Sequence, residues 1–265
     1  MAQPGIALAT KKPKTFYISV KILESLGLAF HSCAPGDKYC RDARIIITTQ
    51  SESRRLDSAR TLIIDDIPDE TTTSLDIMIR YLSSTPPKEI IIGIDPGLHN
   101  GLAVVVDGRP TYGRVLASPI DAADITTKLM RHSQETYSDS RVITRIGLGS
   151  KLYSALLLRC LLHKMPDVCF ELVDERYTTT QGGYFKDQFS AELIATRTGR
   201  QVQESDIELE PKRGFLRGLQ HLFSWLTDKR GELSIDTARS ILAGEISLSQ
   251  ALTEFHQLEK NRSTA

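Results

Sequence analysis

The sequence lacks an excess of charge of either sign, a zinc-type cysteine pattern and any long apolar run. Its 33 basic residues balance 33 acidic residues, so it is unlike a histone-type coat protein, and any nucleic-acid binding must come from a local basic patch. Its four cysteines are spaced neither as a zinc site nor as a dense disulfide framework, which favours a reducing compartment. No apolar run approaches the roughly 18 residues of a membrane span, and the polar start is unlike a signal peptide. These absences predict a soluble, cytoplasmic protein that does not bind membranes.

The chain is long enough for one large or two small domains. With 265 residues, 40% of them hydrophobic, it can bury a sizeable core. Residues 1–14 are rich in lysine and proline, and this composition predicts a flexible tail. Residues 15–84 hold two helical patterns and three short β-rich runs, at 28–31, 44–49 and 61–65. This alternation predicts a small α/β domain.

A second domain is predicted after the tandem prolines at 86–87, because prolines block a continuing helix. In this domain, residues 88–230, three strands with an Asp-Gly hairpin turn at 107–108 precede alternating helices and strands and a last helix near 214–227. This order predicts a mixed α/β sheet with helices on both faces. Residues 231–265 hold two short amphipathic segments, which predict a helical hairpin that either packs on a domain face or mediates self-association.

Asp95 ends an apolar run and precedes Pro96 and Gly97, so we expect its carboxylate where a strand stops and water can enter. A carboxylate in such a place is a ligand for a hard cation, although it serves equally well to satisfy the amides of a turn. Gly93, Gly97 and Gly101 permit the close approach of another backbone or of a phosphate, or are simply turn residues. Asp95 is therefore a candidate metal ligand with a structural alternative.

A second pair of acids, Asp174 and Glu175, follows an apolar run directly. Successive side chains of a strand point to opposite faces, so only one of the two is expected to meet Asp95. The alternative is a solvated strand end at which Glu175 and Arg176 form ion pairs elsewhere. Their place at a strand end of the same predicted sheet favours the functional interpretation.

Two groups of residues are candidates for binding phosphate. Ser150 and Lys151 begin a leucine-rich helix whose N-terminal amides can receive a phosphate oxygen, with Ser150 as an ordinary N-cap as the alternative. Lys212, Arg213 and Arg217 lie near the start of the last predicted helix, where they bind phosphate or form an exposed helix face. Arg176 is a further candidate. The histidines show no metal-ligand spacing.

Three short stretches resemble the RuvC-type Holliday-junction resolvases and their YqgF-type relatives. Residues 92–97 (Ile-Gly-Ile-Asp-Pro-Gly), followed by Gly-Leu-Ala-Val at 101–104, resemble the first strand of both branches. Residues 174–179 (Asp-Glu-Arg-Tyr-Thr-Thr) resemble the Asp-Glu-Arg-Leu-Thr-Thr element of the YqgF branch, and residues 146–149 (Ile-Gly-Leu-Gly) lie where that branch has a glycine-containing strand end. The resemblance covers about residues 90–227.

This resemblance implies a ribonuclease-H-like fold and a nuclease that acts on structured or branched DNA or RNA with Mg²⁺ or Mn²⁺. Asp95 and Glu175 would be the metal-ligating carboxylates, and the resolvases' dimers suggest a homodimer. In both branches the last helix begins with an aspartate, whereas Arg213 or Gly214 occupies that place here. Glu210, one turn earlier, is the candidate third catalytic acid.

Two other functions remain open on the sequence. The missing aspartate is consistent with an inactive member of the fold that binds nucleic acid or protein without cleavage. The Asp95 turn followed by Gly101 also resembles the first phosphate loop of actin-like phosphotransferases. However, no second Asp-x-Gly phosphate loop follows it.

Overall fold

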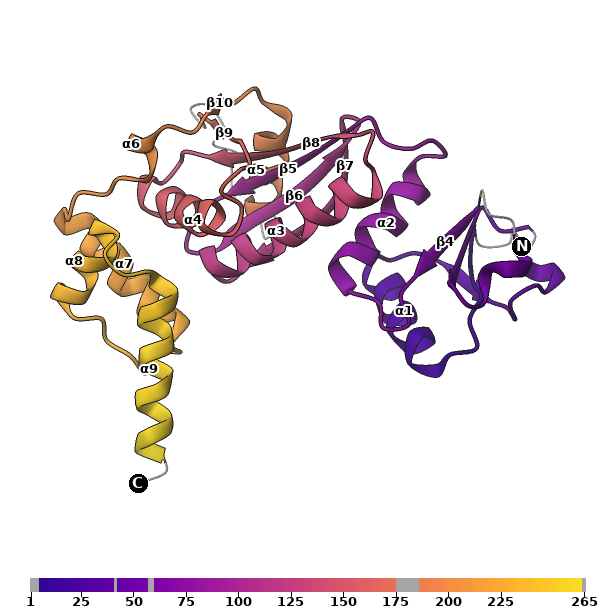
Figure 1. The fold of residues 1–265 in the computed structure, drawn as a ribbon, viewed down its shortest axis with the longest axis horizontal. Helices are drawn as coiled ribbons and strands as arrows, with labels where there is room; N and C mark the ends of the chain where they lie inside the picture. The colour runs from indigo at the N-terminus through magenta and orange to yellow at the C-terminus, as the bar shows by residue number, and fades with distance from the viewer. Residues whose placement is uncertain (1–4, 41, 57–59, 175–185, 264–265) are drawn as a thin grey trace. The chain divides into compact units, whose positions relative to one another are not determined.

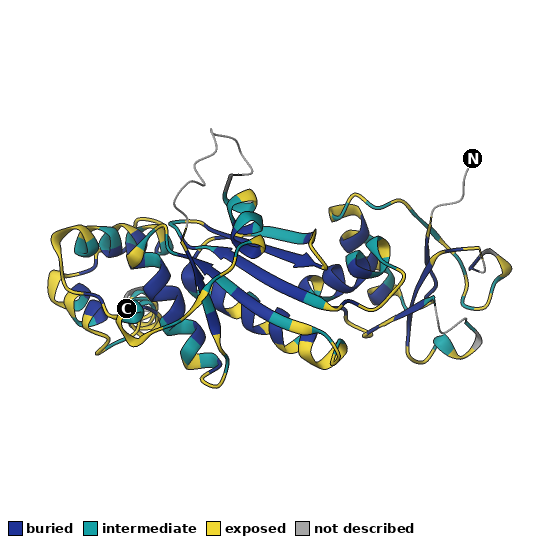
Figure 2. Ribbon diagram, turned by 90° about the horizontal axis from the view of Figure 1, so that it is seen from above, coloured by how far each residue is buried: buried dark blue, intermediate teal, exposed yellow. Residues whose placement is uncertain are grey.

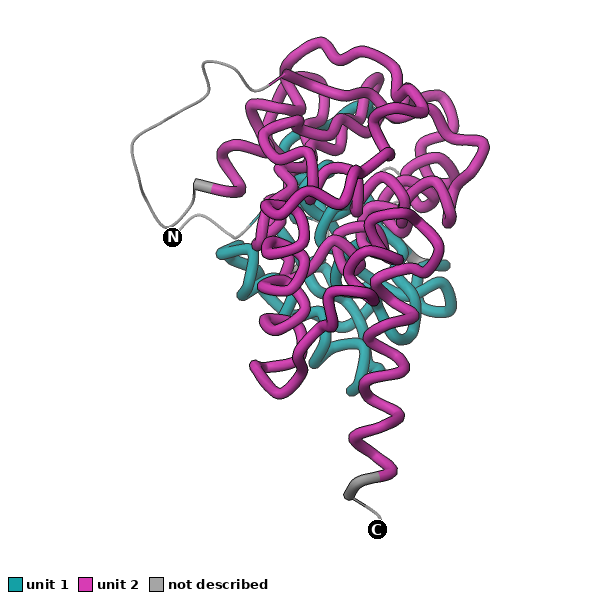
Figure 3. Tube along the Cα trace, turned by 90° about the vertical axis from the view of Figure 1, so that its left-hand side faces the viewer, with its two compact units in different colours: residues 1–87 teal, residues 88–265 magenta. Residues whose placement is uncertain are grey.

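The computed structural model describes residues 5–40, 42–56, 60–174 and 186–263. The chain divides into two compact units, residues 1–87 (unit 1) and residues 88–265 (unit 2), shown in Figure 3. Each unit has its own β-sheet flanked by helices, so the chain is a mixed α/β protein. Among the described residues, no helix is long and apolar enough to cross a membrane.

Unit 1 is built on a parallel sheet with the strand order β2-β1-β3-β4. Its elements are β1 (Ile6–Leu8), α1 (Pro13–Ser25), β2 (Phe30–Ser32), β3 (Ile45–Thr49), β4 (Thr61–Ile64) and α2 (Glu70–Leu82), with 3₁₀ turns at Lys38–Cys40 and Ser53–Arg55. Apolar side chains of α1 and α2 pack on one face of the sheet. The Asp69 carboxylate caps α2 by accepting a hydrogen bond from the Thr72 amide, and Gly27 takes the left-handed conformation just after α1.

The prediction of a flexible tail over residues 1–14 is wrong for residues 5–14, the part of this segment that the structure describes. Ile6–Leu8 form a strand between β2 and β3 with no exposed surface, and α1 already begins at Pro13. The three-residue strand is too short for a periodicity signal, and the surrounding lysines and prolines dominate the composition. Burial between two neighbouring strands supplies the free energy that offsets the entropy lost when this segment becomes ordered.

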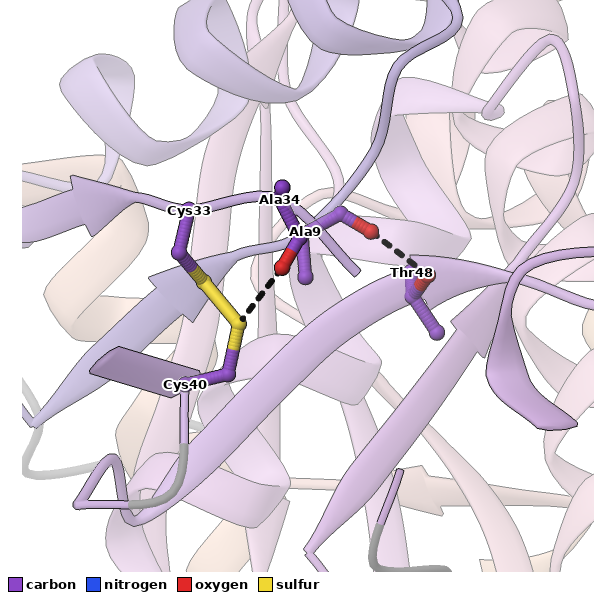
Figure 4. The surroundings of a disulfide bond; sticks show 5 residues. All are labelled: Ala9, Cys33, Ala34, Cys40 and Thr48. Carbon is purple, nitrogen blue, oxygen red and sulfur yellow. Dashed lines mark hydrogen bonds between the residues drawn. A yellow bond between two sulfur atoms is a disulfide. The ribbon is translucent and has the colours of Figure 1, made fainter. Parts of the chain in front are cut away.

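A disulfide between Cys33 and Cys40 holds the loop that covers the second face of this sheet (Figure 4). Cys40 packs there with Ala7, Ala9 and Ile46. The loop connects β2 to β3 and takes the place that a helix has in most α/β units. Cysteine spacing did not predict this pair, and because disulfides are rare in reducing compartments, the cysteines no longer support a cytoplasmic location.

Unit 2 contains a six-stranded sheet with the order β10-β9-β8-β5-β6-β7 (Figure 1). Its strands are β5 (Glu89–Asp95), β6 (Asn100–Val106), β7 (Arg109–Leu116), β8 (Arg141–Gly147), β9 (Phe170–Val173) and β10 (Arg200–Gln201). Its helices are α3 (Pro119–Thr136), α4 (Lys151–Lys164), α5 (Lys186–Thr196), α6 (Glu204–Ile207), α7 (Arg213–Leu226), α8 (Ile235–Ala243) and α9 (Leu248–Ser263).

Strands β5, β6 and β7 form an antiparallel meander, whereas β8 and β9 run parallel to β5. The β6–β7 turn is the predicted hairpin: Asp107 and Gly108 both have positive φ, as a type I′ turn requires. Because β5, β8 and β9 are parallel, their carboxyl ends lie at one edge of the sheet, here called the carboxyl edge. Figure 2 shows the buried strands at the centre of this unit.

Helices cover both faces of the unit 2 sheet, as predicted. On one face α3 packs beside α4, and Thr144 of β8 donates a hydrogen bond to the sulfur of Met130 in α3. On the other face α5, which the sequence analysis missed, lies across β5 and β6. A Cβ on Gly93 would overlap the backbone oxygen of Ala191, so this glycine admits a helix backbone and not a phosphate.

The C-terminal helices α8 and α9 share an apolar core with α4 and α7. Ser234 caps α8, which ends at Gly244 in the left-handed conformation. The Arg159 guanidinium of α4 donates hydrogen bonds to the backbone oxygens of Ile241 and Leu242, at 2.7 and 2.8 Å. The predicted hairpin therefore packs on unit 2 through a helix end as well as through apolar side chains.

Candidate nucleic-acid interface

Asp95 is the last residue of β5 and lies at the carboxyl edge, where the sequence predicted it. It pairs directly with Gly101 of β6, and the preceding Ile94 pairs with Ile146 of β8. Side chains alternate along a strand, so Asp95 lies on the same face as Gly93, which is the α5 face. The Asp95 side chain is half-buried. The backbone of Asp95 is therefore fixed by strand pairing, and its carboxylate has partial access to solvent.

The second acidic pair begins at the same edge, two strands away. Val173 of β9 is in register with Gly147 of β8, so Asp174 follows at the level of the Asp95 turn. The backbone oxygen of Asp174 accepts a hydrogen bond from the Arg197 guanidinium. Glu175 and Arg176 lie outside the described residues, so the approach of Glu175 to Asp95 and the phosphate role of Arg176 stay predictions.

Asp187 is an acidic residue that the sequence analysis missed. It lies in the first turn of α5, and a Cβ on Gly101 would overlap its backbone oxygen. Because Gly101 is the direct strand partner of Asp95, α5 carries Asp187 to the Asp95 end of the sheet. The sequence contains only an indirect indication of α5, namely the glycines at 93, 101 and 113, which are the small positions on which this helix packs.

Glu210, the candidate third acid, is engaged in a local ion pair. Its carboxylate lies 2.9 Å from the Lys212 ammonium, and its side chain is 77% exposed. The hydrogen bond from Lys212 lowers the pKa of Glu210 below its ordinary value. Asp206 is similarly held by two hydrogen bonds from Arg200, which lower its pKa. A catalytic role for Glu210 stays a prediction, and this pairing counts against it.

The start of α4 carries the first of the predicted phosphate-binding groups. Ser150 is the N-cap residue of α4, as its structural alternative predicted, but its hydroxyl forms no capping hydrogen bond. Lys151 is exposed beside it and helps to lower the pKa of both Asp206 and Glu210. The N-terminal amides of α4 therefore lack a cap from Ser150, and a cation lies next to them.

Helix α7 carries the second group and lies across the carboxyl edge. Gly218 packs against Leu152 in the first turn of α4, and the Trp225 and His99 rings form a T-shaped pair with centroids 5.1 Å apart. His99 belongs to the loop that follows Asp95. In Figure 1, α7 and α8 lie on the side of the sheet toward which β5 points.

Arg213 and Arg217 are both exposed on α7. Within the described part of the chain, neither guanidinium forms a hydrogen bond or an ion pair. The neighbouring Lys212, in contrast, is paired with Glu210. Both guanidinium groups are therefore available to bind an anion.

The described residues contain no group of three or more His, Cys, Asp or Glu side chains placed to hold a metal ion. Next to Asp95, the Asn100 side chain is completely buried, and in the described structure neither its oxygen nor its nitrogen has a hydrogen-bond partner. The carboxyl edge thus offers one well-placed acid, a second acid on α5 and a strand end whose next residues are not described.

Comparison with known proteins identifies no family. No family model matches the chain, and no curated protein matches it. Among solved structures, the Marinitoga piezophila Argonaute in complex with a 5′-OH guide RNA matches at 11% identity and a TM-score of 0.25, over 64% of this chain and 39% of that chain. CetZ from Methanosaeta thermophila matches at 10% identity and a TM-score of 0.25, over 89% of this chain and 59% of that one. Likeness at this level supports no conclusion about fold or function.

Proposed function

We propose that unit 2 has a ribonuclease-H-like fold and acts on structured or branched DNA or RNA as a nuclease that depends on Mg²⁺ or Mn²⁺. One observation carries the proposal: the central strand β5 of a mixed sheet ends in Asp95, and the parallel strand β9 ends at Val173, directly before Asp174, at the same edge. An antiparallel meander followed by two parallel strands, with helices on both faces, is consistent with that fold.

The carboxylates at the carboxyl edge have the right chemistry to bind a divalent ion, but the described residues include no group of three or more such ligands placed to hold one. Carboxylate oxygens are the ligands that Mg²⁺ and Mn²⁺ prefer, and Asp95 together with Glu175 would hold the ion. A bound ion would activate water or stabilise the leaving oxygen. Asp187 is the described acid placed to complete the set. The contribution of the chain is to fix the Asp95 backbone at the end of β5, on a rigid sheet edge.

The test is cleavage of four-way junctions, flaps and RNA hairpins in Mg²⁺ or Mn²⁺. We expect Asp95→Asn to lower the rate by more than the roughly 10–100-fold that loss of an outer-shell partner costs. Asp107→Asn is the matched control, because the same charge is removed at the opposite end of the β5–β6 hairpin. Cleavage that is absent, or equal in both variants, would refute the nuclease proposal.

A second candidate function is binding without cleavage. It is favoured by the pairing of Glu210 with Lys212 and of Asp206 with Arg200, which leaves α7 with free arginines and without an acid at its start. Retained binding without cleavage in the same assay would support it. An actin-like phosphotransferase is less consistent with the structure, because the parallel sheet of unit 1 is not a second copy of the mixed sheet of unit 2.

A further inference from the structure

The outer face of α7 carries a row of residues at four-residue spacing. Arg213, Arg217, His221 and Trp225 are all exposed, while the inner face buries apolar side chains in the core shared with α4 and α8. Each four-residue step advances about 6 Å along the helix and turns about 40° around it, so the four side chains form an inclined row, here called the α7 row. Helix α7 contains no aspartate or glutamate. The row is therefore a positively charged strip with an aromatic ring at one end.

The charge of this strip is not neutralised locally. Arg213 and Arg217 have no hydrogen bond or ion pair among the described residues. Two acids lie near the Trp225 end, and both have contacts of their own. Asp228 lies 3.8 Å from the Arg230 guanidinium, and the Asp121 carboxylate accepts a hydrogen bond from the Ser118 hydroxyl. The end of the row formed by Arg213 and Arg217 is thus complementary to the phosphates of a polyanion.

Trp225 is the only tryptophan of the chain and is 42% exposed. Its ring packs against the His99 ring in a T-shaped arrangement, at an interplanar angle of 88°. The ring also borders a hollow of about 550 Å³, lined in addition by Ala117, Asp121, Leu226, Asp228 and Lys229. Trp225 therefore presents part of a large aromatic ring to the hollow, where a planar group could stack on it.

We infer that the α7 row binds an unpaired strand of nucleic acid, with backbone phosphates on Arg213 and Arg217 and one base stacked on Trp225 in the hollow. Arginine forms two parallel hydrogen bonds to phosphate, and aromatic rings stack on bases of any sequence. The occupant is unpaired, because a base inside a duplex does not offer its face to a side chain. The inference rests on the proposed nucleic-acid function but not on cleavage. It leads the strand to His99 and so to the Asp95 turn.

The single tryptophan makes this binding measurable at the site itself. The full chain is titrated, without divalent metal, with an oligothymidine strand, an oligouridine strand and a blunt DNA duplex, while tryptophan emission and the anisotropy of a labelled strand are followed. We expect both single strands to quench the emission as they bind, and the duplex to bind more weakly and to quench less.

Three variants at two positions separate the contributions of Trp225 and Arg217. Trp225→Ala should weaken single-strand binding about 5- to 150-fold, whereas Trp225→Phe keeps most of the affinity. Arg217→Gln should lower the salt dependence of log K by about 0.7 for the one lost phosphate contact. Tyr17→Ala is the control, because Tyr17 is an exposed aromatic with Lys21 over its ring in unit 1. Its affinity should equal that of the wild type.

Binding of a strand with unchanged tryptophan emission would overturn this inference and leave the proposed function standing. Duplex binding that equals or exceeds single-strand binding would do the same. Absence of any nucleic-acid binding would refute both proposals, whereas emission quenching without cleavage in added Mg²⁺ or Mn²⁺ would support the α7 row and count against the nuclease alone. The wild-type quenching experiment decides the question even if Trp225→Ala fails to fold.

Discussion

At the scale of single residues, three acidic side chains of unit 2 are held in ion pairs. Arg200 holds Asp206, Lys212 holds Glu210, and Arg145 of β8 lies 2.8 Å from Glu171 of β9. Such pairs reduce the capacity of a carboxylate to bind a cation. Glu171, Asp206 and Glu210 are therefore weak candidates for metal ligands.

Glu52 is the best-partnered carboxylate of unit 1. It accepts hydrogen bonds from the Thr10 hydroxyl at 2.6 Å, the Lys11 amide at 2.8 Å and the Thr49 hydroxyl at 2.8 Å. Burial alone would raise the pKa of Glu52, but these hydrogen bonds outweigh it, and the pKa falls below the ordinary value of 4.5. The side chain thus joins the β1–α1 loop to the end of β3.

We expect this network to make unit 1 sensitive to acid. A carboxyl whose pKa is lower in the folded state stabilises the fold above its unfolded pKa, and this contribution disappears as the pH falls through the folded pKa. Glu52→Gln should cost about 1 kcal/mol at neutral pH, a value reduced for the partial exposure of the site, and should flatten the loss of stability below pH 4.5. Urea titrations followed by the amide NMR signals of β3 measure both effects.

The control for this prediction is Glu24→Gln, which removes an exposed carboxylate from α1. It should leave the pH dependence as in the wild type. If Glu52→Gln and the wild type lose stability in parallel as the pH falls, the hydrogen bonds to Glu52 do not contribute as described.

At the scale of elements, α5 determines the second face of the unit 2 sheet. It lies close to β5 and β6 because Gly93 and Gly101 have no side chain toward it and because Ala191 and Ala195 are small. This close approach brings Asp187 next to the strand partner of Asp95. A helix of this kind is difficult to predict, since small residues give weak apolar periodicity.

Gly93→Ala tests this packing. The added Cβ would overlap the backbone oxygen of Ala191, which cannot move without displacing α5. We expect a loss of about 1–3 kcal/mol in the unfolding free energy of unit 2. Urea unfolding followed by the emission of Trp225 reports this transition. Gly214→Ala, in open space at the start of α7, is the matched control and should be neutral or slightly stabilising. Equal stability of the two variants would contradict the packing described for α5.

At the scale of the whole molecule, the two units differ in what covers the faces of their sheets. Unit 2 covers its sheet with helices on both faces, whereas unit 1 covers one face with a loop closed by the Cys33–Cys40 disulfide. A short loop has little regular backbone hydrogen bonding, so its order depends more on the covalent link and on the few apolar contacts of Cys40.

Reduction should therefore affect one unit only. We expect a thiol reductant, or the double substitution Cys33→Ser and Cys40→Ser, to lower the stability of unit 1 by about 2 kcal/mol and to leave the Trp225 transition of unit 2 unchanged. Hydrogen exchange of β3 amides measures the first effect, and tryptophan emission measures the second. The doubly substituted protein should show no further response to reductant. A change in the Trp225 unfolding transition of unit 2, or unchanged hydrogen exchange of the β3 amides in unit 1, would contradict this prediction.

Features governed by neighbouring residues could be predicted from the sequence: the hairpin at 107–108, the helix end at Gly27, the cap at Asp69 and the position of Asp95 at the end of an apolar strand. Their physical basis lies in a few consecutive residues, through backbone conformation, capping and periodic burial. Only the tertiary structure decided that β1 is a strand, that α5 covers β5, that Cys33 joins Cys40 and that Arg213, Arg217, His221 and Trp225 form one exposed row. These features depend on burial and contacts between residues far apart in the chain, which no local pattern records.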